Sequence, residues 1–495
     1  MTRVGSRLIV LLVSLAVFSG CATQVEIQRP AEQRGWDDSV NAALEDAHQQ
    51  LQQARDPGLQ VQQALQLADA YIAMGAESEA SHYAQFANRI IVQHELPLYD
   101  QTLDLIRVLY ALGQEQTADR RLQEMLDRLT LSGDEPLQGE YLVLLLELVF
   151  QLEEPSADLF RRVTDRVLFI GDAQIRSSVL RETIRLMWQA SFSGDVTGIV
   201  QHAIAATSGI EDRVAQAAGY LHLSGLIHAL GRQITGVDAQ ELAQRGMRIW
   251  RQADLWSIER DSAAMAVRGS MLSGNTAVLE EILNGIPGNQ ARVEILVTQA
   301  YWLAAQGLRD PAAVALEYAG RYVGAVDSPE LRAAGMAGIA LGQQLIGDPD
   351  AAAAGLRSAA DTAVRYWNTN PEAAYAAARV LAERGEPDAV LGIAGDQRDP
   401  LNQAAVYLRL YAEMGETGLS RIDGLILREL PFVLRRIGWS RSNQLPELVA
   451  QVVVRAAERG DTALLAELRA IRPPQELQVM IEARYAQALL IRLEQ

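Results

Sequence analysis

The chain has 495 residues and a formal net charge of −18, and all of its 44 basic residues are arginine. A chain this acidic is unsuited to bind nucleic acid or an anionic lipid surface through its bulk charge. Its single cysteine, Cys21, leaves no other thiol for a disulfide, a zinc site or a cysteine nucleophile.

Residues 1–20 have the pattern of an export signal. Arg3 and Arg7 precede an apolar stretch, which the tetrapeptide 18–21 (Phe-Ser-Gly-Cys) closes. This tetrapeptide resembles a lipobox, the signal at which bacterial lipoproteins are acylated and cleaved. The apolar stretch is too short to span ~30 Å of hydrocarbon at ~1.5 Å per residue, which argues against a transmembrane anchor. We therefore expect a signal peptide over 1–20 and a lipoprotein that carries palmitate-type acyl chains on Cys21.

Residues 21–35 are polar, include Pro30 and lack a hydrophobic period, so they predict a flexible tether behind the lipidated cysteine. Ala22 follows the cysteine where an aspartate would favour the inner membrane. We expect the protein to be anchored in the bacterial cell envelope, in the outer membrane and facing the periplasm. After Cys21 no stretch approaches ~18 uncharged apolar residues, so we expect no second membrane segment.

From Trp36 onward the pattern is helical, and glycines mark a regular series of helix ends. Glycine is favoured there because the residue that ends a helix commonly has a positive φ angle. The expected stops are Gly75, Gly113, Gly194, Gly231, Gly274, Gly307, Gly347, Gly385, Gly415 and Gly460. Their spacing averages about 38 residues if Glu153-Glu154 fills the gap after Gly113, which is typical of helix-pair repeats. The sequence thus predicts an all-α solenoid of about ten or eleven antiparallel helix pairs.

Helix starts are marked independently by a capping side chain before a proline. The expected starts are Asp310-Pro311, Ser328-Pro329, Asp348-Pro349, Asn370-Pro371 and Asp399-Pro400. They alternate with the glycine stops, so both signals predict the same helix boundaries.

The spacing of large and small residues resembles that of tetratricopeptide repeats. The matching positions are Leu67, Ala68, Tyr71, Gly75, Ala80 and Ala87, then Leu105, Leu109, Gly113, Ala118 and Leu122, with further matches around 300–319 and 340–359. Ala84 departs from the pattern, because the family prefers an aromatic residue there. We expect TPR-like repeats over 36–130 and an irregular TPR-like or HEAT-like solenoid over 131–495.

We find no motif for a phosphate loop, a dinucleotide, calcium or a nucleophile elbow, and we expect no cofactor, no metal site and no catalytic activity. Three acidic pairs leave one alternative open, a cell-wall or glycan-acting enzyme with an acid pair in a helical groove. These pairs are Asp37-Asp38, Glu153-Glu154 and Glu280-Glu281. The glycines Gly335, Gly338 and Gly342 fall within one helix, where small residues indicate close helix contact.

Two groups of residues are candidates for binding a partner. Once the packing positions of the first repeats are assigned, Asp69, Ile72, Arg107 and Tyr110 remain to face the groove. The second candidate is the basic, aromatic stretch with Arg435, Arg436 and Trp439, because arginine and tryptophan are frequent at binding hot spots. Stacked helix pairs offer an extended concave surface, so we expect a lipid-anchored scaffold that binds a protein partner.

Overall fold

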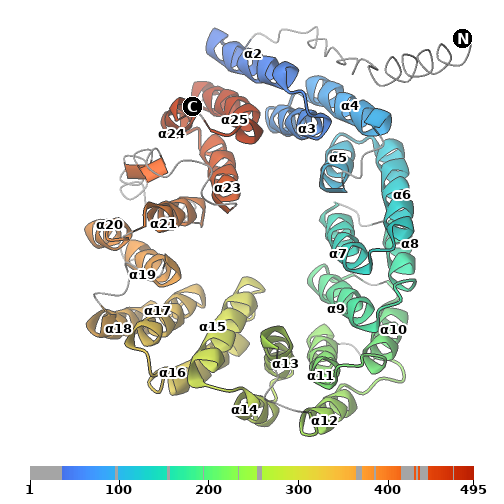
Figure 1. Ribbon diagram of the computed structural model, residues 1–495, viewed down its shortest axis with the longest axis vertical. Helices are drawn as coiled ribbons and strands as arrows, with labels where there is room; N and C mark the ends of the chain where they lie inside the picture. Colours follow the sequence, from blue (N-terminus) through green and yellow to red (C-terminus); the bar gives the residue numbers. More distant parts are fainter. Residues whose placement is uncertain are drawn as a thin grey trace, which may run out of the picture. The chain divides into compact units, whose positions relative to one another are not determined.

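The computed structural model describes residues 36–495 except 95–98, 153–155, 193, 232–233, 254–258, 364–370, 384–385, 398, 414–428, 431–432, 435–443, 472 and 495. Its regular secondary structure consists of 23 α-helices, arranged in tandem as shown in Figure 1. The predicted all-α solenoid of helix pairs is confirmed. None of the described helices is long and apolar enough to cross a membrane. Cys21 and the predicted signal and tether lie outside the described residues.

The chain folds into two compact units. Unit 1 joins residues up to Gly113 with the segment Ala456–Gln495, and unit 2 comprises Gln114–Arg455. Helix α23 (Gln444–Glu458) spans the boundary between unit 2 and unit 1, which falls between Arg455 and Ala456.

Unit 2 is a stack of helix pairs with a layer of first helices and a layer of second helices. The first helices are α7 (Glu135–Gln151), α9 (Ala173–Gln189), α11 (Arg213–Leu230), α13 (Arg260–Leu272), α15 (Asn289–Ala305), α17 (Pro329–Leu345), α19 (Pro371–Glu383) and α21 (Pro400–Glu413). The second helices are α6 (Glu115–Ser132), α8 (Ala157–Val167), α10 (Val196–Ser208), α12 (Ala239–Trp250), α14 (Thr276–Gly285), α16 (Arg309–Val323), α18 (Pro349–Ala363) and α20 (Pro387–Gly395). Each first helix from α7 to α19 packs against its own second helix and against the next first helix along the chain.

Polar contacts between neighbouring pairs have the sequence separation of one repeat. Glu135 accepts hydrogen bonds from the backbone nitrogens of residues 171 and 172, which lie 36 and 37 residues further along. The Tyr301 hydroxyl donates to the carbonyl oxygen of Gly338 at 2.6 Å, and Tyr318 donates to Glu280 at 2.8 Å. The predicted period of about 38 residues is therefore visible in the lateral contacts themselves.

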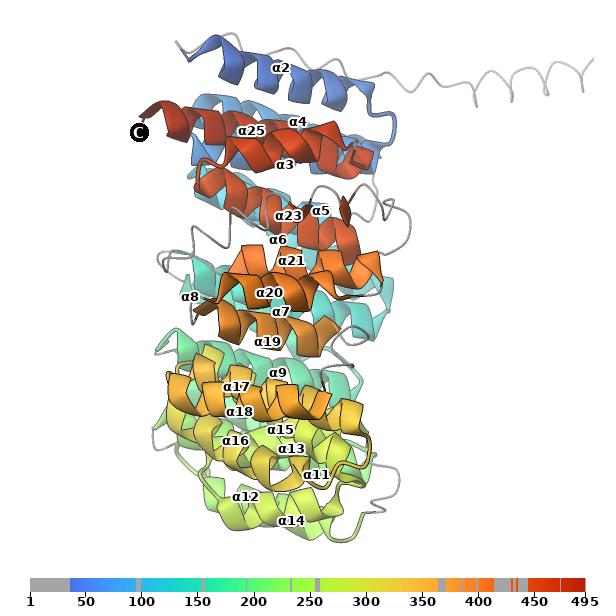
Figure 2. The ribbon, with the colours of Figure 1, turned by 90° about the vertical axis from the view of Figure 1, so that its left-hand side faces the viewer.

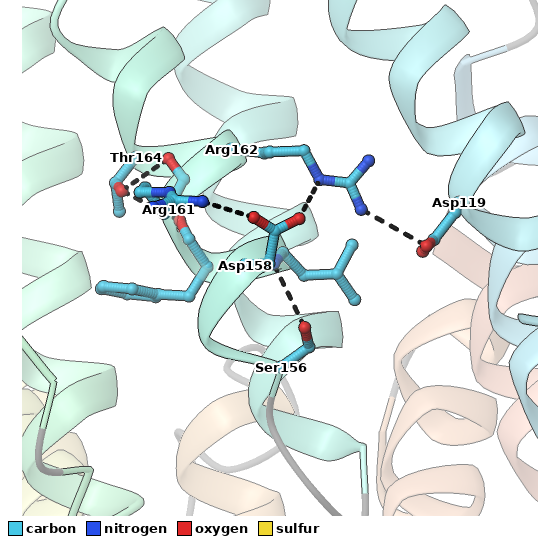
Figure 3. A network of polar contacts seen from close by, with 8 residues as sticks. Asp119, Ser156, Asp158, Arg161, Arg162 and Thr164 are labelled. Carbon is cyan, nitrogen blue, oxygen red and sulfur yellow. Dashed lines mark hydrogen bonds and ion pairs between the residues drawn. The ribbon is translucent and has the colours of Figure 1, made fainter.

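The second helices are joined by exposed ion pairs. Arg162 on α8 lies between Asp158 of its own helix, at 3.2 Å, and Asp119 of α6, at 3.5 Å (Figure 3). Arg161 pairs with Asp158 at 2.6 Å, and the hydroxyl of Ser156 caps the helix. Pairs that remain partly exposed contribute only ~0–1 kcal/mol each, so the stability of the stack comes mainly from its apolar packing.

Most of the predicted glycine stops have the expected conformation. A positive φ is found at Gly75, Gly113, Gly231, Gly274, Gly307, Gly347 and Gly460. The prediction at Gly194 is wrong, because α9 already ends at Gln189 and the residue with positive φ is Ser191. Gly385 and Gly415 lie outside the described residues.

The capping prediction holds at three described starts. Ser328, Asp348 and Asp399 accept hydrogen bonds from backbone nitrogens in the first turns of α17, α18 and α21. Asn370 lies outside the described residues, although α19 begins at Pro371 as expected. The start at Asp310-Pro311 is wrong by two residues, because α16 begins at Arg309, behind the N-cap residue Leu308.

Glycines inside helices let neighbouring helices approach closely. A Cβ atom at Gly342 of α17 would lie 2.5 Å from Leu316 on α16, which confirms the packing role expected for this glycine series. A closer contact, which the sequence did not indicate, joins α11 to α13. There a Cβ at Gly225 would lie 2.4 Å from the carbonyl oxygen of Gly269. These two backbones touch, so neither position accommodates a side chain without displacement.

Unit 1 brings the two ends of the chain together. It contains α2 (Asp38–Gln53), α3 (Pro57–Ala73), α4 (Glu77–His94) and α5 (Tyr99–Ala111) from the N-terminal segment, and α24 (Thr462–Ala470) and α25 (Gln475–Glu494) from the C-terminal one. Helix α25 packs beside α3 as a first helix does, and it packs against α2 as a first helix packs against its second helix (Figures 1 and 2). We call this α25–α2 combination the terminal repeat, because each end of the chain supplies one of its helices.

Specific polar contacts hold the terminal repeat. The side chain of Gln63 on α3 donates to the carbonyl oxygen of Gln475, at the start of α25, at 2.9 Å. Arg469 on α24 pairs with Asp46 of α2 at 3.2 Å and with Glu482 of α25 at 2.7 Å. Helix α2 also buries apolar side chains, among them the fully buried Leu51.

Candidate functional site

A cluster of charged side chains lies on α3, α5 and α25 of unit 1. Arg107 on α5 donates through Nη2 to Oδ2 of Asp69 on α3 at 2.6 Å, and the two residues are 38 positions apart. Their side chains remain 47% and 25% exposed. Glu147 and Arg185 form the same kind of pair between α7 and α9 of unit 2, also 38 positions apart. The two groove residues predicted with opposite charges thus occupy equivalent repeat positions and bind each other.

The electrostatics of this cluster reflect partial burial and mixed charge. Burial lowers the pKa of Arg107, but Asp69 and Asp104 outweigh that effect, so the net pKa is raised. Burial raises the pKa of the Asp104 carboxyl, and Arg107 opposes that rise only in part. Arg484 of α25 also senses Asp69, although burial lowers its pKa overall. Asp69 therefore lies within electrostatic reach of a cation from each segment of unit 1.

The two other groove candidates lie one turn further along the same helices. Ile72 follows Asp69 on α3 and Tyr110 follows Arg107 on α5, and both side chains are half-buried. Residues three apart share a helix face, so each helix offers a charged and an apolar group on the same side. We call the set Asp69, Ile72, Arg107 and Tyr110 the α3–α5 face.

The remaining candidates fall outside the described residues. They are Cys21, Arg435, Arg436 and Trp439. The lipid attachment and the second binding region therefore stay predictions.

Three of the four described residues of the acidic pairs in the enzyme alternative make structural contacts. Asp37 caps α2 by accepting from the backbone nitrogen of Ser39 at 2.9 Å. Glu281 accepts two hydrogen bonds from Arg251, at 2.5 and 2.7 Å, which lowers the pKa of its carboxyl. Glu280 accepts from Tyr318. Glu153 and Glu154 lie outside the described residues.

Two buried residues of unit 2 were missed by the sequence reasoning. Arg181 on α9 is only 3% exposed and His222 on α11 only 2%. Burial, followed by the charges of nearby arginines, holds the pKa of His222 well below its ordinary value. A signal was available for Arg181, since it interrupts the apolar stripe formed by Leu180, Ile184 and Met187. A basic residue in such a stripe has to be buried with its charge.

Comparison with protein-family models and with curated proteins gives no match. Among solved structures, the chain is similar to a protein described as a "Circular tandem repeat protein with novel repeat topology and enhanced subunit contact surfaces". The two share 13% identity over 91% of this chain and 97% of the other, with a TM-score of 0.18.

Proposed function

We propose that this protein is a non-catalytic scaffold of the bacterial cell envelope, anchored by lipid on Cys21, that binds a protein partner through the α3–α5 face. The observation that carries the proposal is the partly exposed Asp69–Arg107 pair, with a half-buried apolar side chain one turn further on each helix. Mixed polar and apolar groups of this kind suit a protein interface, where charged groups give specificity and apolar groups are desolvated. The lipid would keep such a surface at the membrane.

The anchor is tested separately from the binding surface. In Cys21→Ala the protein should lose its acyl label and accumulate either uncleaved or released from the membrane fraction. A membrane fraction and a mass identical to those of the unaltered protein would contradict the lipid anchor and leave the binding proposal unaffected.

The binding surface is tested by exchanging the two charges. Each single change, Asp69→Arg or Arg107→Glu, breaks the intramolecular pair, whereas the double variant restores it with reversed polarity. The exchange also sets like charges near Asp104 and Arg484. The double variant should therefore have a melting temperature closer to that of the unaltered protein than either single variant does, while a partner sees the opposite charge pattern. A matched control exchanges Asp127 and Arg166, a pair between α6 and α8 of unit 2 whose residues are 39 positions apart.

The readout is cross-linking and affinity capture from the native envelope, with mass spectrometry of the captured proteins. We expect the Asp69/Arg107 exchange, and Tyr110→Ala independently, to remove a protein that the Asp127/Arg166 control still captures. If the exchange and Tyr110→Ala both leave the captured set unchanged, the α3–α5 face is not the binding surface.

A further inference from the structure

A cavity of about 640 Å³ opens in unit 2, at the N-terminal ends of α7, α9, α11 and α13. Small-molecule sites usually measure about 300–1,000 Å³, so the cavity has the size for a small organic ligand. Its lining is divided by burial: Arg181, Val179 and Ile210 are buried, whereas acidic side chains line its exposed part.

The buried lining of the cavity includes Arg181, a cation that forms no ion pair with any described residue. Nη1 of Arg181 donates to Oγ of Ser177 at 2.5 Å, and that hydroxyl is shared with Thr207 at 2.7 Å. Arg181 makes no ion pair with any described residue, and Ser177 is neutral. The neighbouring Glu182 acts on Arg181 through its charge, but its carboxylate accepts a hydrogen bond from Arg185.

The surroundings of Arg181 are shaped to keep this side chain in place. A Cβ atom at Gly219 of α11 would lie 3.1 Å from Nη1, so the glycine leaves room for the guanidinium. Burial lowers the pKa of Arg181 to about 10, which still leaves the group charged at neutral pH. A buried charge that forms no ion pair is unfavourable, and a carboxylate is the group whose geometry best matches guanidinium.

The exposed part of the cavity carries the opposite charge. Glu140, Glu259 and Asp261 line it, are exposed, and form no ion pair with any described residue. Three carboxylates on one rim attract a cationic group. The lining also includes the apolar, buried side chains of Val179 and Ile210.

We propose that this cavity binds a small zwitterionic ligand, an amino acid or a short peptide. Its carboxylate pairs with Arg181, its apolar side chain packs against Val179 and Ile210, and its ammonium group lies among Glu140, Glu259 and Asp261. This site lies in unit 2 and concerns a small ligand, so it goes beyond the proposed protein-binding scaffold.

The test is calorimetric titration of the full chain with leucine, Ala-Leu and Ala-Ala-Leu, each also prepared as the N-acetyl and the C-terminal amide form. We expect the doubly free form of at least one ligand to bind, and each blocked form to bind about tenfold more weakly or worse, since hydrogen bonds to charged groups are the strong ones. Binding of leucine alone would identify an amino-acid site, and binding of the peptides a peptide site.

Protein variants then assign each end of the ligand. Arg181→Met should bind the ligand with a free carboxylate and its C-terminal amide equally well. The triple variant Glu140→Gln/Glu259→Gln/Asp261→Asn should bind the ligand with a free ammonium group and its N-acetyl form equally well. Arg161→Met, at an exposed arginine of the same unit, is the matched control and should retain the full discrimination.

The proposal is overturned if no ligand in the set binds at millimolar concentration, or if the intact protein does not distinguish acid from amide. Should Arg181→Met fail to fold, the acid–amide comparison on the intact protein and the rim variant, whose changes are all at exposed positions, decide the question. Neither result bears on partner capture, which depends on residues of unit 1.

Discussion

The terminal repeat predicts that α2 unfolds when α25 is removed. If Gln475–Gln495 is deleted, α2 loses the first helix with which it pairs, and its buried side chains Val40, Leu44 and Leu51 become exposed. Burying one such side chain contributes about 1.5–3 kcal/mol, so the docking of α2 is worth roughly 5–9 kcal/mol. An isolated helix of its 16 residues is only marginally stable in water.

The assay is hydrogen exchange read by mass spectrometry on peptides from α2. At 1.4 kcal/mol per tenfold, a loss of roughly 5 kcal/mol or more accelerates amide exchange in α2 about a thousandfold or more. Helices α11 and α13 of unit 2 serve as the internal control and should exchange as before. Full protection of α2 in the truncated protein would refute the terminal repeat, because α2 would then be held without α25.

Two further predictions concern unit 2. The pKa of His222 is lowered from 6.5, first by burial and then by nearby arginines, so the unfolded chain binds its proton more readily than the folded one. Stability should fall as the pH drops below about 6.5, by up to ~1.4 kcal/mol per pH unit, and His222→Leu should make urea-unfolding midpoints less dependent on pH; an unchanged slope would contradict the buried, neutral imidazole. Gly225→Ala should lower the free energy of unfolding by about 1–3 kcal/mol, because its Cβ meets the backbone of Gly269, whereas Gly320→Ala, with open space around it, should raise it by roughly 0.5–1 kcal/mol. Equal effects of the two substitutions would contradict the close approach of α11 and α13.

The binding residues could be placed on helix faces from the sequence, but their contacts could not. The repeat pattern assigned Asp69 and Arg107 to equivalent positions and left their relation open. The structure joins them at 2.6 Å, since neighbouring first helices bring equivalent positions side by side. Arg181 has no local signature except its place in an apolar stripe. Its role as a candidate ligand-binding residue follows only from the tertiary structure, in which it lines a cavity at the ends of four helices.

Local sequence signals determined where the helices begin and end, and non-local packing determined which helices pair. Glycines with positive φ, capping side chains and the spacing of apolar residues act within a few residues of chain, so the sequence by itself revealed tandem helix pairs and most of their boundaries. The pairing of α25 with α2 and α3 joins residues such as Gln63 and Gln475, which are 412 positions apart. No local pattern records such a contact, because it joins residues that lie near opposite ends of the sequence. Only the tertiary structure could show that α25 and α2 form a helix pair.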